Sequence, residues 1–158
     1  MGQSQLSGAL GAPLLVGVLT IVCTVALHGA AGAGVVHLAQ SAVHRGFAGV
    51  RFSRNVMVLS GAMLVALAAH LIQIAIWAVV FELCGEFSGF APAFYHSAVN
   101  YTTLGYGDFV MSPPWRLLGP IEAADGMLMF GYSTAIVVAV VQRVIQVRLD
   151  RISPTSVE

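Results

Sequence analysis

The stretch NYTTLGYGDF, residues 100–109, decides the fold of this chain, because it is a glycine-containing loop set among long apolar runs. Gly105 and Gly107 flank Tyr106, and Asp108 follows directly. Around this loop lie runs that contain no Lys, Arg, Asp or Glu, at residues 1–44, 55–81 and 126–142. Each run can supply the roughly 20 apolar residues that a helix needs to cross a bilayer.

The overall composition is that of a membrane protein rather than a soluble domain. Of the 158 residues, 58% are hydrophobic and only 9% are charged, with a mean hydropathy of +0.85. Six of the seven basic residues fall at two places, with Arg45, Arg51 and Arg54 after the first run and Arg143, Arg148 and Arg151 after the last. By the positive-inside rule we expect these two places in the cytoplasm, and the N-terminus and residues 82–116 outside.

A cleaved signal peptide is the competing interpretation of residues 1–30. The segment MGQSQLSGALG has no basic residues before its apolar stretch, which favours an uncleaved helix. The two cysteines, Cys23 and Cys84, lie in different settings and are predicted to be free thiols.

The apolar runs and turn residues predict an all-α membrane protein. The first helix is expected to begin near Pro13 and to reach at least His28; residues 29–44 either prolong it or bend towards the inner surface. The segment that opens at Pro92 is too short to cross, so we expect a half-span entering from outside. The predicted parts are an N-terminal helix and cytoplasmic loop at 1–54, an outer helix at 55–81, a short helix at 92–102, a loop at 103–108, an inner helix at 117–147 and a tail at 148–158.

The backbone polar groups of loop 103–108 need hydrogen-bond partners or water, and this requirement suggests the function of the loop. Non-helical backbone at membrane depth is tolerated only when it is buried in protein or lines a water-filled path. Gly105 and Gly107 have free access to positive φ, so the chain can alternate its handedness and point successive carbonyls the same way. A column of carbonyl oxygens, with the Thr103 hydroxyl at its inner end, can replace the water shell of a monovalent cation.

The same residues resemble the potassium channels of the pore-loop superfamily, whose filter signature is Thr-Val-Gly-Tyr-Gly-Asp. Residues 103–108 read Thr-Leu-Gly-Tyr-Gly-Asp, with Leu104 in place of Val. The resemblance implies a bacterial channel subunit with one extra N-terminal helix, located in the inner membrane and assembled as a homotetramer in the lipid bilayer. It implies that K+ passes as the permeant ion, without any cofactor. The implied ion-binding residues are Thr103, Leu104, Gly105, Tyr106 and Gly107, with K+ held at the first four.

The resemblance also implies roles for residues around the filter loop. Support of the filter is assigned to His96, Tyr101, Thr102 and Asp108, with His96 placed beside Asp108 as a hydrogen-bond donor to its carboxylate. Phe94, Tyr95 and Tyr101 are expected around Tyr106. Gly126 and Gly131 correspond to the family's gating hinge, although small residues in membrane helices are equally typical of packing contacts.

Two acids near the outer start of the last helix, Glu122 and Asp125, have two interpretations. Acids near a helix N-terminus are favoured by the helix dipole, so they could cap the helix after Pro120. Alternatively they have buried partners or face the ion, because acids inside a membrane span are costly and often functional.

Other functions fit the sequence less well. Arg51 and Arg54 are a lone pair and not the arginine series of a voltage sensor. The histidines, at positions 28, 37, 44, 70 and 96, lack the paired spacing of a metalloenzyme, so we expect no catalytic residues and no enzyme. Nucleic acid is not an expected partner. A non-selective cation channel and a non-conducting subunit that keeps the channel fold remain the alternatives.

Overall fold

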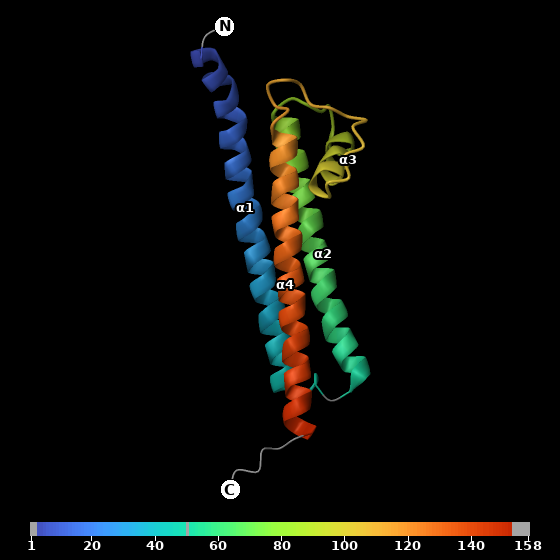
Figure 1. Cartoon of the computed structure of the whole chain (residues 1–158). Helices are drawn as coiled ribbons and strands as arrows, with labels where there is room; N and C mark the ends of the chain where they lie inside the picture. Colours follow the sequence, from blue (N-terminus) through green and yellow to red (C-terminus); the bar gives the residue numbers. More distant parts are fainter. Residues whose placement is uncertain (1–2, 50, 153–158) are drawn as a thin grey trace. The chain divides into compact units, whose positions relative to one another are not determined.

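The computed structural model describes residues 3–49 and 51–152, and within them the chain is helical (Figure 1). Its elements are α1 (Gln3–His44), α2 (Phe52–Leu83), α3 (Phe90–Tyr101) and α4 (Leu118–Ile152). Three of these helices are long and apolar enough to cross a membrane, over Leu10–His44, Phe52–Leu83 and Leu118–Leu149. The fourth, α3, has only 12 residues. The prediction of three long apolar helices and one short helix is therefore confirmed.

The first helix differs from its predicted start. Pro13 lies inside α1 and not at its first turn, because helix is already described from Gln3 onward. The open question about residues 29–44 is also answered, since α1 runs without a break to His44. The predicted bounds of the other helices differ from the structure by up to five residues: α2 is longer at both ends, α3 begins before Pro92, and α4 continues to Ile152, into the tail predicted at 148–158.

The chain divides into two compact units, and α1, α2 and α4 each contribute to both. The first unit comprises Met1–Leu27 and His70–Phe130, and therefore holds α3 and the loop that follows it. Its core is built on Trp77 and Phe81 of α2, Tyr101 of α3 and Leu118 of α4, all without solvent exposure. Figure 1 shows α3 folded back beside the ends of α2 and α4 within this unit.

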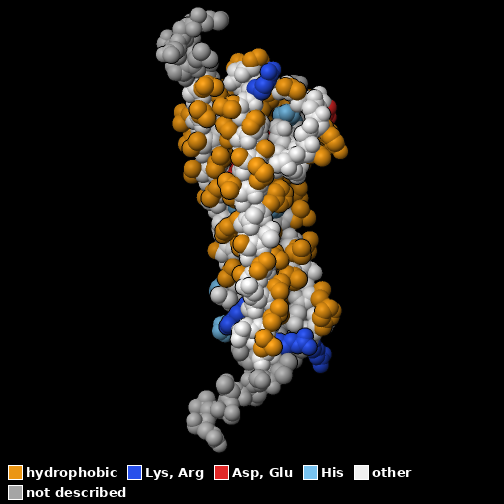
Figure 2. Space-filling model, viewed as in Figure 1, with side chains coloured by type: hydrophobic (Ala, Val, Ile, Leu, Met, Phe, Trp, Pro, Cys, Tyr) orange, Lys and Arg blue, Asp and Glu red, His pale blue; other side chains and the backbone are white. Residues whose placement is uncertain are grey.

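The second unit comprises His28–Ala69 and Gly131–Glu158. Its smaller core joins Val35 and Ala39 of α1 with Ala62 of α2 and Val140 of α4. Many hydrophobic side chains remain at the surface of the helices (Figure 2). Among the large ones, Leu64 is 66% exposed and Leu128 is 65% exposed. Such surfaces are expected where lipid or a neighbouring subunit covers the helices. Both cysteines are free thiols, as predicted.

Candidate functional site

The loop after α3 is the candidate site, and local hydrogen bonds fix its start. Helix α3 ends at Tyr101, and the amide of Thr103 then donates to the Asn100 carbonyl at 2.8 Å. The amide of Leu104 donates to the Val99 carbonyl at 2.9 Å. Because these bonds satisfy the last carbonyls of α3, the chain leaves the helix in a defined direction.

The backbone of this loop alternates between two conformations. Thr103, Gly105 and Gly107 have φ of +59°, +63° and +74°, whereas neither Leu104 nor Tyr106 has positive φ. A left-handed backbone is unusual for threonine, so Thr103 is held there against its own preference. Alternating handedness turns successive peptide groups towards the same side of the chain. The alternation predicted from the two glycines is thus confirmed, and it begins two residues earlier, at Thr103.

The loop is also open to its surroundings in the single chain. Residues 102–110 are all exposed, with Leu104 at 53% and Tyr106 at 67%. Thr102 uses its hydroxyl locally, donating to the Ala98 carbonyl at 2.7 Å. An exposed loop of apolar and glycine residues is a surface that further chains can cover.

Asp108 has an aromatic donor, but it is not the predicted one. A hydrogen bond with the Asp108 carboxylate raises the pKa of Tyr95. His96 is instead paired with Asn100, with 2.9 Å between the ring Nε2 and the amide Nδ2. Burial lowers the pKa of His96, and the nearby charges of Asp108 and Glu86 oppose this shift. His96 therefore lies close enough to sense Asp108 but forms no hydrogen bond with it.

Tyr101 lies in the core of its unit. Its side chain has no solvent exposure, and its hydroxyl donates to the Gln73 side chain. The hydroxyl is also 3.1 Å from Nδ1 of His70, and the ring packs on Phe130 with centroids 5.7 Å apart. Tyr101 therefore fixes the end of α3 to α2 and α4, which supports the loop from its base rather than from its side.

Glu122 and Asp125 are fully buried within the first unit. They lie beyond the first turn of α4, which contains no acid, so the capping interpretation is wrong. The Ser97 hydroxyl of α3 is 2.5 Å from Oε1 of Glu122. For Asp125, Oδ2 accepts from the Trp77 indole at 2.9 Å and lies 2.8 Å from the Thr24 hydroxyl. The alternative of buried partners is therefore the correct one.

The number of protons available for the hydrogen bonds around Glu122 indicates that its carboxyl group is protonated. The Ser97 hydroxyl lies within hydrogen-bond distance of both the Ile74 carbonyl, at 2.8 Å, and the Glu122 carboxyl. A hydroxyl has one proton to donate, so both contacts are satisfied when Ser97 donates to the carbonyl and a protonated Glu122 donates to Ser97. The Thr24 hydroxyl has the same choice between the Ile21 carbonyl, at 2.9 Å, and Asp125. Neutral carboxyls also avoid the cost of charge in a dry core.

These contacts join α1 to the site, which the sequence did not indicate. Thr24 of α1 contacts Asp125 of α4, and its carbonyl accepts from the Gln73 side chain at 2.9 Å. In the same unit, Gly17 of α1 packs closely against Ile121 of α4. The only available signal was the presence of polar residues inside apolar helices, a pattern that marks functional or packing positions without naming their partners.

Of the two predicted hinge glycines, only Gly126 has a close neighbour. A Cβ at Gly126 would overlap the carbonyl oxygen of Tyr101 and lie 3.0 Å from its carbonyl carbon. At Gly131 an added Cβ would meet nothing within 4 Å. The absence of a side chain at Gly126 is therefore required for α4 to approach the end of α3.

A family model described as ion channel matches residues 55–143, which is more than half of the chain. The match begins at the start of α2, continues through α3 and the exposed loop, and includes most of α4. This chain therefore belongs to that ion channel family. Searches of curated proteins and of solved structures found no match.

Proposed function

We propose that this chain is the subunit of a homotetrameric potassium channel, in which residues 103–107 line the ion path. The observation that supports the proposal is the regular alternation of φ from Thr103 to Gly107. It gives the backbone the geometry needed for a column of carbonyl oxygens, which can replace the hydration shell of K+. The proposed K+ ligands are the backbone oxygens of Thr103, Leu104, Gly105 and Tyr106, together with the Thr103 hydroxyl.

Four copies are proposed because one loop cannot enclose an ion. Closed cyclic symmetry brings identical loops to one axis, and the exposure of Leu104 and Tyr106 in the single chain leaves room for that contact. The C-terminal end of α3 is the negative end of its dipole and would favour a cation below the loop. The proposed orientation has the N-terminus outside and residues 45–54, with their three arginines, in the cytoplasm of a bacterial cell.

Ion flux from reconstituted liposomes tests the proposal. Purified protein is expected to carry K+ in strong preference to Na+, and Ba2+, which is close to K+ in size with twice the charge, is expected to block it. Gly107→Ala should abolish flux, because a Cβ is disfavoured at φ +74°. Gly85→Ala, at φ +75° in the turn after α2, is the matched control outside residues 103–107 and should conduct.

Two other outcomes would select the alternatives. Equal permeability to K+ and Na+ would identify a non-selective cation channel. Folded, tetrameric protein that passes no cation would identify a non-conducting subunit.

A further inference from the structure

The second unit carries an unusual excess of positive charge. Its described stretches, residues 28–49, 51–69 and 131–152, contain six arginines and one acid, Asp150 near the end of α4. The arginines are Arg45, Arg51, Arg54, Arg143, Arg148 and Arg151. Residues 28–69, which include the first three of these arginines, contain no Asp or Glu. The guanidinium groups of this part of the unit are therefore suited to an anion from outside the chain.

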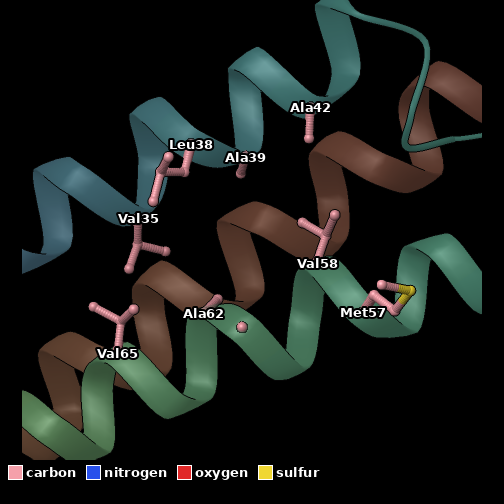
Figure 3. A pocket seen from close by; sticks show the side chains of 9 residues that line it. Val35, Leu38, Ala39, Ala42, Met57, Val58, Ala62 and Val65 are labelled. Atoms are coloured by element: carbon pink, nitrogen blue, oxygen red, sulfur yellow. The ribbon is translucent and has the colours of Figure 1, made fainter.

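An apolar groove lies between α1 and α2 in this unit (Figure 3). It has a volume of about 220 Å³, and every side chain that lines it is apolar. Val35 and Leu38 of α1 lie on one side and Met57 and Val65 of α2 on the other. Gly61 also lines the groove, and a Cβ added there would meet nothing within 4 Å. The small residues of both helices therefore leave a space that apolar atoms can fill.

A basic pocket of about 540 Å³ adjoins this groove, since Leu38 and Ala42 line both. Its polar lining consists of His37, Ser41, Arg45 and Arg54. The guanidinium carbon of Arg54 lies 5.1 Å from the ring centre of Phe47, a cation–π contact that holds this side chain beside the pocket. Two guanidinium groups, an imidazole and a hydroxyl are suitable donors for the oxygens of a phosphate.

We propose that the basic pocket and the apolar groove together bind one anionic phospholipid, with its phosphate between Arg45 and Arg54 and one acyl chain along the groove. Basic pockets between membrane helices bind anionic headgroups in this way. The proposal rests on the location of the chain in a bilayer, which its family and its three apolar helices support, and is independent of potassium selectivity.

Charge and shape favour this occupant over two others. A second copy of the chain would bring the same arginine-rich unit to the pocket, so predominantly like charges would meet. A free phosphate would satisfy the arginines but leave the groove unfilled. A lipid with an anionic headgroup matches both halves of the site, and the bilayer supplies it at high local concentration.

Lipid binding to the purified full chain in detergent tests the proposal, with native mass spectrometry counting the lipids bound. Phosphatidylglycerol is titrated against phosphatidylcholine of the same acyl chains. We expect tighter binding of phosphatidylglycerol, and a loss of about thirtyfold in Arg45→Gln/Arg54→Gln, because each arginine near an anionic lipid contributes on the order of 1 kcal/mol. The matched control Arg51→Gln/Arg148→Gln removes the same charge from residues that line neither cavity and should retain the preference.

The groove is tested separately with Gly61→Leu, which fills the space from a position where a side chain has room. This variant should weaken binding of long-chain phosphatidylglycerol but not of its dihexanoyl form. Circular dichroism and oligomer size establish that each variant is folded.

Three results would overturn the proposal. An equal loss of affinity for phosphatidylglycerol in both double-arginine variants would mean that the lipid is held by unspecific charge attraction. Binding of inorganic phosphate as tight as that of the lipid would mean a simple anion pocket. Loss of the oligomer in Gly61→Leu with unchanged lipid binding would mean that a second copy fills the groove.

Discussion

Substitution of Gly126 tests how α4 supports the loop after α3. In Gly126→Ala the new Cβ would overlap the Tyr101 carbonyl oxygen and lie 3.0 Å from its carbonyl carbon, whereas ordinary van der Waals contact begins at 3.4 Å. The neighbouring atoms are backbone, which cannot turn away as a flexible side chain can. Either α4 or the end of α3 must therefore move, and the loop follows directly from that end.

Gly131→Ala provides the matched control for the size of the effect. Replacement of glycine by alanine within a helix stabilises both variants by about 1 kcal/mol through the higher helix propensity of alanine. This contribution cancels when the stabilities of the two variants are compared. Only Gly126→Ala meets the backbone, and overpacking of this kind costs roughly 1–3 kcal/mol. We therefore expect Gly126→Ala to be less stable than Gly131→Ala by that amount, which corresponds to a change of about 5- to 150-fold in the ratio of folded to unfolded protein.

The assay is unfolding in mixed micelles of increasing SDS content, followed by circular dichroism, with ion flux measured on the same preparations. We expect Gly126→Ala to lose both stability and flux. If Gly131 is the gating hinge, Gly131→Ala should change flux at unchanged or increased stability. Equal stability of the two variants would refute the role assigned to the contact between Gly126 and Tyr101.

Two further predictions concern titratable groups near the loop. Burial lowers the pKa of His96 below its usual 6.5, so the unfolded chain binds a proton at His96 more readily than the folded chain does. The stability that neutral His96 contributes is therefore fully present above about pH 6.5 and is lost as the pH falls below that value. Thermal unfolding at pH 7.5 and 5.5 should show this loss in the wild type and not in His96→Phe, and an equal response in both would exclude His96. If Glu122 and Asp125 are protonated, the free energies of unfolding of Glu122→Gln and Asp125→Asn should lie within about 1 kcal/mol of the wild-type value. The corresponding alanine variants should be less stable, because Ser97 or Trp77 then loses a hydrogen-bond partner. An amide variant as unstable as its alanine counterpart would indicate that the carboxyl is charged.

The sequence alone determined the membrane class and the helix plan. The absence of charge over residues 1–44, 55–81 and 126–142 leaves few alternatives to apolar helices, because charged groups are costly in a bilayer. Gly105 and Gly107 likewise predicted the alternating backbone, since this property depends on local conformational freedom.

Only the tertiary structure decided which side chains meet. Asp108 pairs with Tyr95 and not with His96, although the two candidates are adjacent in α3, because the direction of each side chain depends on how the helix is rotated against its neighbours. Asp125 is a buried partner of Thr24 and Trp77 rather than a helix cap. A sequence gives the spacing along one helix, whereas these contacts join residues of different helices, and their geometry is set by how the helices pack.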